Sequence, residues 1–256
     1  MPIFNGGRIG SNNDPTTSLA SGLWTGLEQC DAIRREIWPG FAPSIVTDGL
    51  VLHLDAGDTN SYPGSGTTWT DLSGNGRTGT LVNGVGYNGG NGGSLSFDGV
   101  DDNVNCGSSI ITGNNSFSWG CWIKPTSGTA GTPLFLGTNS SGQAMVSYWD
   151  YSNNKVHVGV WGSDKLTSGT TILPSTWGHT FWTWNGSTLT SYTNGVSDGN
   201  ATGFSFNISS SYTRIGSAFD IQYFNGNIAQ VSIYNRALTD TEIQQNFNAL
   251  KGRYGL

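Results

Sequence analysis

The amino-acid sequence predicts an all-β protein, an antiparallel two-sheet sandwich of the jelly-roll type, and three observations lead to this prediction. Only 11% of the 256 residues are charged, which is too few for the solvent face of a long amphipathic helix or coiled coil. The 39 glycines, with many Ser, Thr and Asn residues, are typical of a chain with frequent turns. From Gly49 onward, apolar residues recur with the period of two that is expected of strands.

About a dozen such runs follow one another at intervals of roughly 8–15 residues, which is typical of a sandwich or jelly roll. The run over residues 117–123 alternates Phe, Trp, Cys and Ile with other residues. Asn185-Gly186 and Asn194-Gly195 separate later runs and predict tight hairpins. We expect the Trp residues inside the runs to lie in the core.

The N-terminal region lacks this alternation. Residues 1–22 are rich in Gly, Asn and Thr and predict an extended arm, whereas residues 23–38 carry the apolar stripe of an amphipathic helix. Such a helix must bury its stripe against a partner. We therefore expect residues 1–47 to be an anchoring segment and residues 48–256 to be the sandwich domain. The expected anchoring residues are Leu23, Trp24, Leu27, Ile33, Ile37 and Trp38.

A second short helix is predicted near the C-terminal end. Thr239 and Glu242 have the spacing of a capping box, and Ile243 and Phe247 follow at helical spacing. We expect Gly252 to end this helix.

Charge and cysteine content exclude several classes of protein. The net charge is -6 and the basic residues do not cluster, so neither duplex nucleic acid nor a membrane surface is an expected partner. Three cysteines without a CxxC spacing indicate neither a disulfide framework nor a zinc cluster. Cys106 and Cys121 could pair, but buried free thiols are the preferred interpretation. The first residues lack the features of a signal peptide, so we expect synthesis in a cytoplasm.

The residues that hydrolases need are missing from the predicted sheets. Glu occurs only at positions 28, 36 and 242, which excludes a pair of strand-borne glutamates. Asp101 and Asp102, read as neighbours on a strand, would point to opposite faces and could not flank one bond. We therefore expect no enzymatic activity, and a depolymerase built on Asp residues is the weakest of the alternatives.

Two acidic loops could hold a hard cation. One carries Asp98, Asp101 and Asp102 within five residues, and the other begins at Asp71. Calcium prefers oxygen ligands supplied by such loops. The interpretation that we favour is structural, with these carboxylates accepting backbone N–H groups in Asx turns. No cofactor is required, and Ca²⁺ is the candidate ion.

Aromatic residues near turns are the candidates for contact with a glycan. Trp149, Tyr151 and Trp161 flank a turn at residues 152–154, and Tyr223 is a fourth candidate. We expect these rings to be more exposed than the Trp residues inside the runs, and thus able to stack on sugar rings.

Four motifs in order resemble laminin G-like, concanavalin A-like jelly-roll domains. They are GLVLHLDAG (49–57), WTDLSGNGRTGT (69–80), SFDGVDD (96–102) and GNIAQVSIYNRAL (226–238). The resemblance covers residues 48–254 and implies two antiparallel sheets of six or seven strands, one with a concave face. Many relatives carry an acidic pair in the last strand where this chain has Ala229 and Gln230, a departure that weakens an implied calcium site.

The N-terminal segment resembles the leader of virion structural proteins of tailed phages, through NDPTT (13–17), ASGLW (20–24), EQ (28–29) and WP (38–39). This resemblance implies a non-enzymatic structural protein on the virion surface, as a capsid decoration, fibre or tail appendage. Its expected partners are other capsid or tail proteins and further copies of itself. The alternative is a carbohydrate-binding adhesin module for host-surface polysaccharide.

Overall fold

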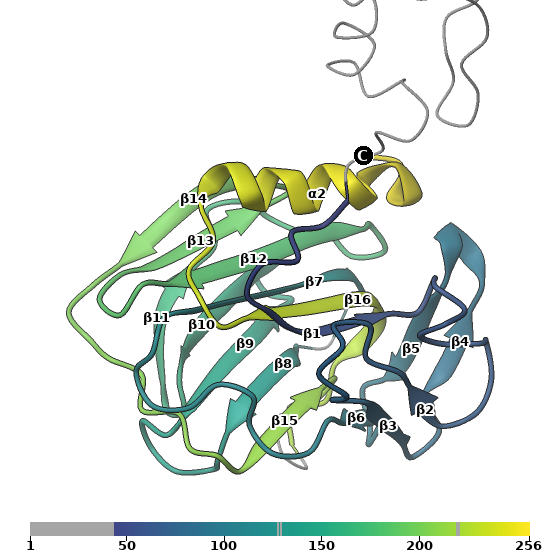
Figure 1. The fold of residues 1–256 in the computed structure, drawn as a ribbon, viewed down its shortest axis with the longest axis horizontal. Coiled ribbons are helices and arrows are strands. Elements are labelled where there is room, and N and C mark those ends of the chain that lie inside the picture. Colours follow the sequence, from purple (N-terminus) through teal and green to yellow (C-terminus); the bar gives the residue numbers. More distant parts are fainter. Residues whose placement is uncertain (1–43, 127, 129, 219–220) are drawn as a thin grey trace, which may run out of the picture. The chain divides into compact units, whose positions relative to one another are not determined.

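The computed structural model describes residues 44–126, 128, 130–218 and 221–256. The chain divides into two units between Ile45 and Val46, and the fold presented here is that of the second unit. Its strands form two antiparallel sheets whose inner faces pack against each other (Figure 1). This arrangement confirms the jelly-roll sandwich predicted from the sequence. The expected number of six or seven strands per sheet is wrong, because short edge strands bring each sheet to eight.

The first sheet, called the covered sheet, has eight strands. In pairing order they are β14 (Val196–Ala201), β13 (Leu189–Thr193), β12 (Gly178–Trp184), β7 (Phe117–Pro125), β16 (Asn225–Tyr234), β5 (Ser94–Asp98) and β4 (Gly86–Asn88), with β1 (Leu50–Asp55) also pairing with β16. A short 3₁₀ helix, η1 (Gly90–Gly92), joins β4 to β5.

The second sheet, called the open sheet, also has eight strands. In pairing order they are β11 (Ser163–Thr167), β10 (Lys155–Val160), β9 (Ala144–Asp150), β8 (Gly131–Gly137), β15 (Tyr212–Ile215), β6 (Asn103–Asn105), β3 (Gly79–Val82) and β2 (Thr68–Trp69). Strands β8 to β11 follow one another as a meander, whereas β15 reaches the sheet from much later in the chain.

Aromatic rings from adjacent strands fill the space between the sheets. Phe117 stacks on Trp119 with 4.7 Å between ring centroids, and Trp119 stacks on Trp182 at 6.4 Å. Trp119, Trp182 and Trp184 are at most 1% exposed, as expected of Trp residues inside the strand runs. Cys106 and Cys121 are buried free thiols, which confirms the preferred interpretation, and burial raises the pKa of each to about 12.

The central strand β7 is buried on both faces because a helix covers the outside of its sheet. Trp122 points outward, where its ring stacks on Phe247 at 5.6 Å and on Tyr254 at 4.1 Å. Gly120 lies opposite Phe181 on the same outer face. A Cβ atom at Gly120 would lie 2.1 Å from Cδ2 of Phe181 and 2.5 Å from the carbonyl oxygen of Thr180, so only glycine fits there.

The helix on that face is α2 (Asp240–Tyr254) (Figure 1). The Thr239 side chain accepts a hydrogen bond from the Glu242 amide, and the Glu242 carboxylate accepts one from the Thr239 amide, so the predicted capping box is confirmed. The predicted end at Gly252 is wrong. The helix continues to Tyr254, because it is Gly255 that adopts the left-handed conformation, with φ of 74°, and caps the last turn.

Both predicted hairpin turns are present. A four-residue turn over residues 185–188, which begins with Asn185-Gly186, connects β12 to β13, whereas Asn194 and Gly195 alone connect β13 to β14. Asn194 and Gly195 both have positive φ, 52° and 78°, as a type I′ turn requires.

Candidate functional site

The outer faces of the two sheets differ in what covers them. The α-helix of the described residues packs on the covered sheet, so the outer face of the open sheet is the surface on which strands are accessible (Figure 1). Along β9, Met145, Ser147 and Trp149 are buried, whereas Val146 and Tyr148 are half-buried on the opposite face. Side chains alternate across a strand, so the second set lines the outer surface.

A groove of about 420 Å³ lies on this outer face, over β9, β10 and β11. Residues from three separate stretches of chain line it: Val146, Tyr148, Val160, Trp161, Gly162, Ser163, Asp164 and Gln222. One wall is apolar, since Trp161 packs edge-on against Phe135 with ring centroids 6.1 Å apart. Gln222 and Asp164 are exposed and add hydrogen-bonding groups. The groove thus combines aromatic rings with polar side chains, the combination found in sites for small polar ligands.

A polar cluster around His157 adjoins the groove. The imidazole lies between two carboxylates, with Nε2 3.7 Å from Oδ2 of Asp150 and Nδ1 3.6 Å from Oδ2 of Asp164. Nδ1 is also 3.0 Å from Oγ1 of Thr167, and Nε2 is 3.2 Å from the amide nitrogen of Asn153.

Tyr148 faces the same cluster. Its ring contacts His157 edge-on, with 6.3 Å between the ring centroids. Burial and the nearby carboxylates of Asp150 and Asp164 raise the pKa of its phenol, so the hydroxyl remains a donor at neutral pH. The groove therefore offers a phenolic donor, a carboxylate acceptor and an amide that can do both.

The four residues predicted to contact a glycan differ in their exposure and in their distance from the groove. The expected exposure of Trp149 is wrong, because its pairing with Val156 places the side chain on the inner face of the sheet, where it is fully buried. Its indole Nε1 donates a hydrogen bond to the carbonyl of Ile172. Tyr151 is 51% exposed at the β9–β10 turn. Trp161 lines the groove, and Tyr223 is half-buried beside Gln222.

Sequence reasoning missed Tyr148, Asp164 and Gln222. Tyr148 could have been found from the period of two, since it alternates with the buried Trp149. Asp164 and Gln222 carry no local signal, because the long-range fold places them beside the groove.

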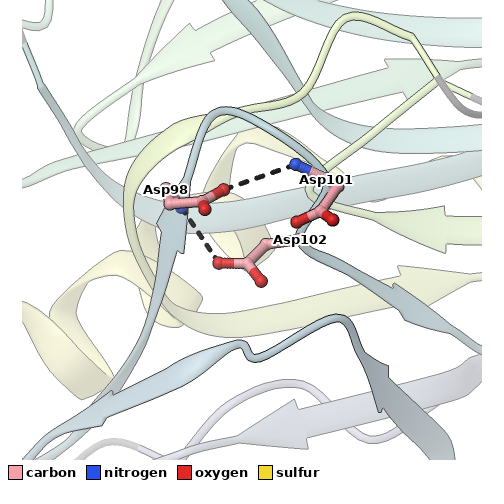
Figure 2. Close-up of side chains that lie close together, drawn as sticks. All are labelled: Asp98, Asp101 and Asp102. Atoms are coloured by element: carbon pink, nitrogen blue, oxygen red, sulfur yellow. Dashed lines mark hydrogen bonds between the residues drawn. The ribbon is translucent and has the colours of Figure 1, made fainter.

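The loop between β5 and β6 brings three carboxylates together (Figure 2). One carboxylate oxygen from each of Asp98, Asp101 and Asp102 lies within 4.8 Å of the others. The expectation that Asp101 and Asp102 point to opposite faces of a strand is wrong, because both precede β6 and lie in the loop.

Hydrogen bonds within this loop are of the expected turn type. Oδ1 of Asp98 accepts from the amide of Val100. It also accepts from the amide of Asp101, and Oδ2 of Asp102 accepts from the amide of Asp98 (Figure 2). Oδ1 of Asp102 is buried without a hydrogen-bond partner among the described residues. Burial, together with the charges of Asp98 and Asp101, raises the pKa of Asp102. The donor set suits a hard cation such as Ca²⁺, and binding of an ion there stays a prediction.

Asp71 lies outside this cluster. Its oxygens accept hydrogen bonds from the backbone amides of His53, Ser73 and Arg77 and from the Ser73 hydroxyl. Burial alone would raise the pKa of Asp71, but these hydrogen bonds outweigh it and lower the pKa. The side chain organises its own loop, as the structural interpretation expects.

The predicted anchoring residues, Leu23, Trp24, Leu27, Ile33, Ile37 and Trp38, lie outside the described residues. Among the residues that are described, no helix is long and apolar enough to cross a membrane.

The two-sheet architecture defines the class of this protein as a laminin G-like jelly-roll domain. A family model described as the concanavalin A-like lectin/glucanases superfamily matches residues 97–244, which is more than half of the chain. The chain belongs to this superfamily. No curated protein sequence matches it.

Several solved structures are similar in fold. Domain 4 of AbnA, an extracellular GH43 arabinanase from Geobacillus stearothermophilus solved with arabinotriose, is 20% identical with a TM-score of 0.64, over 77% of this chain and 97% of that domain. The binding domain of Paraclostridial Mosquitocidal Protein 1 is 18% identical with a TM-score of 0.61, over 79% of this chain and 52% of that one.

Trypanosoma rangeli sialidase is 15% identical with a TM-score of 0.60, over 86% of this chain. The similarity spans only 35% of the sialidase and about half of the toxin domain. At these identities the likeness concerns the fold.

Proposed function

We propose that this protein is a non-enzymatic carbohydrate-binding module that takes a glycan into the groove of the open sheet. The observation that carries the proposal is the pairing of Trp161 and Tyr148 with Asp164 and Gln222 around one hollow. A pyranose or furanose ring has an apolar C–H face and a rim of hydroxyl groups. An aromatic ring fits the face, and carboxylate and amide groups fit the rim.

Two fold relatives support this proposal. The arabinanase domain was solved with arabinotriose, and the mosquitocidal protein fragment is a binding domain. The absence of Glu from residues 49–235 argues against a strand-borne pair of catalytic glutamates.

The test is a glycan array screened with the full chain, followed by calorimetry on the strongest hit. Trp161→Ala is expected to weaken binding by about fivefold or more, since stacking on an aromatic ring contributes about 1 kcal/mol beyond burial. Tyr87→Ala is the matched control, because Tyr87 is 41% exposed on β4 of the other sheet. This control is expected to bind as the wild type does.

Trp161 also packs on Phe135, so a second variant separates binding from folding. Gln222→Asn shortens an exposed side chain at a residue with φ of 53°, a conformation that Asn tolerates, and is expected to weaken binding while the Tm stays close to that of the wild type. Loss of binding in Tyr87→Ala, or full binding in both groove variants, would contradict the location of the site. No bound glycan on a broad array would contradict the function itself.

The wider role that we propose is that of a virion structural protein, with residues 1–47 as the anchor and the jelly roll displayed on the particle surface. The support is the resemblance of that segment to the leader of phage virion proteins. In this role capsid or tail proteins are the partners, and glycan binding by the domain would serve contact with the host.

Cryo-EM of purified particles tests the virion role. Copies at regular capsid positions or at the tail are the expected result, and a chain without residues 1–40 should no longer join particles. Absence of the full chain from particles would contradict the virion role and leave the carbohydrate-binding proposal intact. Polysaccharide cleavage lost in Asp101→Asn/Asp102→Asn would instead identify a depolymerase.

A further inference from the structure

We infer that the groove is part of a longer site that holds an internal stretch of a linear polysaccharide, several sugar units laid lengthwise along β9. This inference rests on the proposed function, because it names the form of glycan that the same groove takes. It follows from the positions of three aromatic residues, Trp161, Tyr148 and Tyr151, on the hairpin of β9 and β10 (Figure 1).

Strand register places Trp161 and Tyr148 at different levels of the groove. Trp161 lies opposite Ala144, since Val160 pairs with Met145 and the Trp161 amide donates to the carbonyl of Ala144 at 3.2 Å. Tyr148 comes four residues after Ala144 on β9, which separates the backbone positions of the two aromatic residues by about 13 Å along the strand. Both residues line the groove, so the groove is elongated in the direction of β9.

Hydrogen-bonding groups lie at the level between these two rings. Asp164 pairs with Gly159, which pairs in turn with Val146, midway along this stretch of β9. Residues directly opposite each other in a sheet share a face, so the Asp164 carboxylate lies on the side of the sheet that carries the groove. The Lys165 ammonium, bonded at 2.9 Å to Oγ of Ser163, adds a donor beside it. Both groups suit the hydroxyl rim of a sugar.

The aromatic surface continues beyond the groove to the β9–β10 turn. Burial, the carboxylates of Asp150 and Asp164, and the Tyr151 phenol together raise the pKa of Tyr148, so the two phenols are neighbours. Tyr151 is 51% exposed, which leaves its ring accessible for stacking. Asn153 in the same turn is exposed and supplies an amide. The combination of aromatic ring and polar group is thus repeated beyond the end of the groove.

A single sugar ring is too short for this row of residues. With covalent bonds of about 1.5 Å, a six-membered ring and its hydroxyl oxygens measure about 6 Å across. Roughly two such rings span the distance from Trp161 to Tyr148, and a third meets Tyr151. Exposed residues flank both ends, Gly162 next to Trp161 and Ser152 next to Tyr151, so a chain can continue past the site in both directions.

The experiment measures how the affinity of the full chain depends on the length of the glycan. Ladders of one to six units from arabinan, xylan, cellulose and amylose are titrated by calorimetry. We expect Kd to fall in steps of roughly fivefold, one for each further stacked ring, up to three units or more, and then to level off. Reduction of the terminal ring of the six-unit chain to an open alditol should leave Kd unchanged, because internal units fill the site.

Variants of Tyr151 test the outer part of the site. Tyr151→Ala should weaken binding of the six-unit chain by about fivefold and leave that of the two-unit sugar unchanged. Tyr151→Phe keeps the ring and should bind both sugars as the wild type does. Tyr87→Ala is the control, because it removes an exposed tyrosine from β4 of the covered sheet, and it should change neither affinity.

Three results would overturn the extended site: equal affinity for one unit and six, loss of binding when the terminal ring is reduced, or a wild-type length dependence in Tyr151→Ala. Binding to an array glycan but to none of the linear ladders would overturn it as well. In all these cases a glycan is still bound, and the carbohydrate-binding function stands. Binding to no ladder and to no array glycan overturns both.

Discussion

Both carboxylate oxygens of Asp55 accept hydrogen bonds from the guanidinium of Arg253, at 2.7 and 3.0 Å. The two residues are 198 positions apart, so this ion pair joins the last turn of α2 to the end of β1. The Asp55 side chain is 9% exposed and that of Arg253 24%, which makes it a largely buried, bidentate pair. Such pairs fix geometry, because each charge is costly without the other.

Removing one partner of this pair is expected to destabilise the domain strongly. Arg253→Met leaves the Asp55 carboxylate buried without its cation, which should lower the free energy of unfolding by about 3 kcal/mol in urea titrations. The double variant Arg253→Met/Asp55→Asn should recover part of the loss, because no unpaired charge is left. Lys251→Met is the control from the same helical turn and should change stability by less than about 0.5 kcal/mol. Equal effects of the two single-site Met variants would refute the role of the pair.

Acid stability is expected to depend on Glu242. Hydrogen bonds from Arg236, together with those from Thr239, lower the pKa of Glu242 to about 2. A carboxyl whose pKa is lower in the folded state stabilises it above its ordinary pKa, and this contribution is lost as the pH falls towards 2. Because the side chain is partly exposed, the contribution is about 1 kcal/mol.

Glu242→Gln should therefore be less stable at pH 7 and show a smaller loss of stability between pH 4.5 and 2. The measurement is the midpoint of urea unfolding at each pH. Asp240→Asn is the control, since it removes a carboxylate from the same first turn that does not contact Arg236. An acid response in Glu242→Gln as steep as in the wild type would count against the assignment.

A second pH effect is expected from His179, at higher pH. Burial among Trp122, Phe181 and Phe247 lowers the pKa of this imidazole to about 3. The unfolded chain takes up the proton at an ordinary pKa, so stability is lost as the pH falls from 6.5 towards 3, at about 1 kcal/mol per pH unit. His179→Phe should flatten this slope in thermal unfolding. Phe181→Leu, a cavity variant beside it, should lower the Tm and keep the slope.

The carboxylate of Asp102 is expected to destabilise the domain at neutral pH when no cation is present. A carboxyl whose pKa is raised in the folded state stabilises it at low pH, and this contribution is lost as the pH rises through the raised value. Asp102→Asn preserves the acceptor for the Asp98 amide and removes the charge, so its Tm in EDTA should be about 2 °C higher.

Calcium is the complementary test of the same loop. At 10 mM, CaCl₂ is expected to raise the Tm of the wild type, because the cation neutralises three neighbouring carboxylates, and to raise that of Asp102→Asn less. MgCl₂ at the same concentration is the control. An identical response of both proteins to calcium would assign the loop a turn-forming role only.

The central strands were predictable because their signal is local. In β7 apolar residues recur at every second position, and in β12 Trp182 and Trp184 have the same spacing, so burial of these side chains selects the strand whatever the neighbours are. The sequence missed the edge strands of both sheets, which are β4 and β14 in the covered sheet and β2 and β11 in the open sheet, and it missed β3 next to β2. The edge strands are short or largely polar, so their extended form follows from pairing with the next strand.

The sequence by itself determined the jelly-roll class, the aromatic core, the capped C-terminal helix and the aspartate turns. In each case residues near in sequence carry the cause: a period of two, a capping box or an Asx turn. The tertiary structure alone decided which aromatic rings are accessible, since the register of β9 on β10 turned Trp149 inward and Tyr148 outward. It also decided where the groove lies, because the β9–β11 meander brings Tyr148, Trp161 and Asp164 together and the long-range fold adds Gln222.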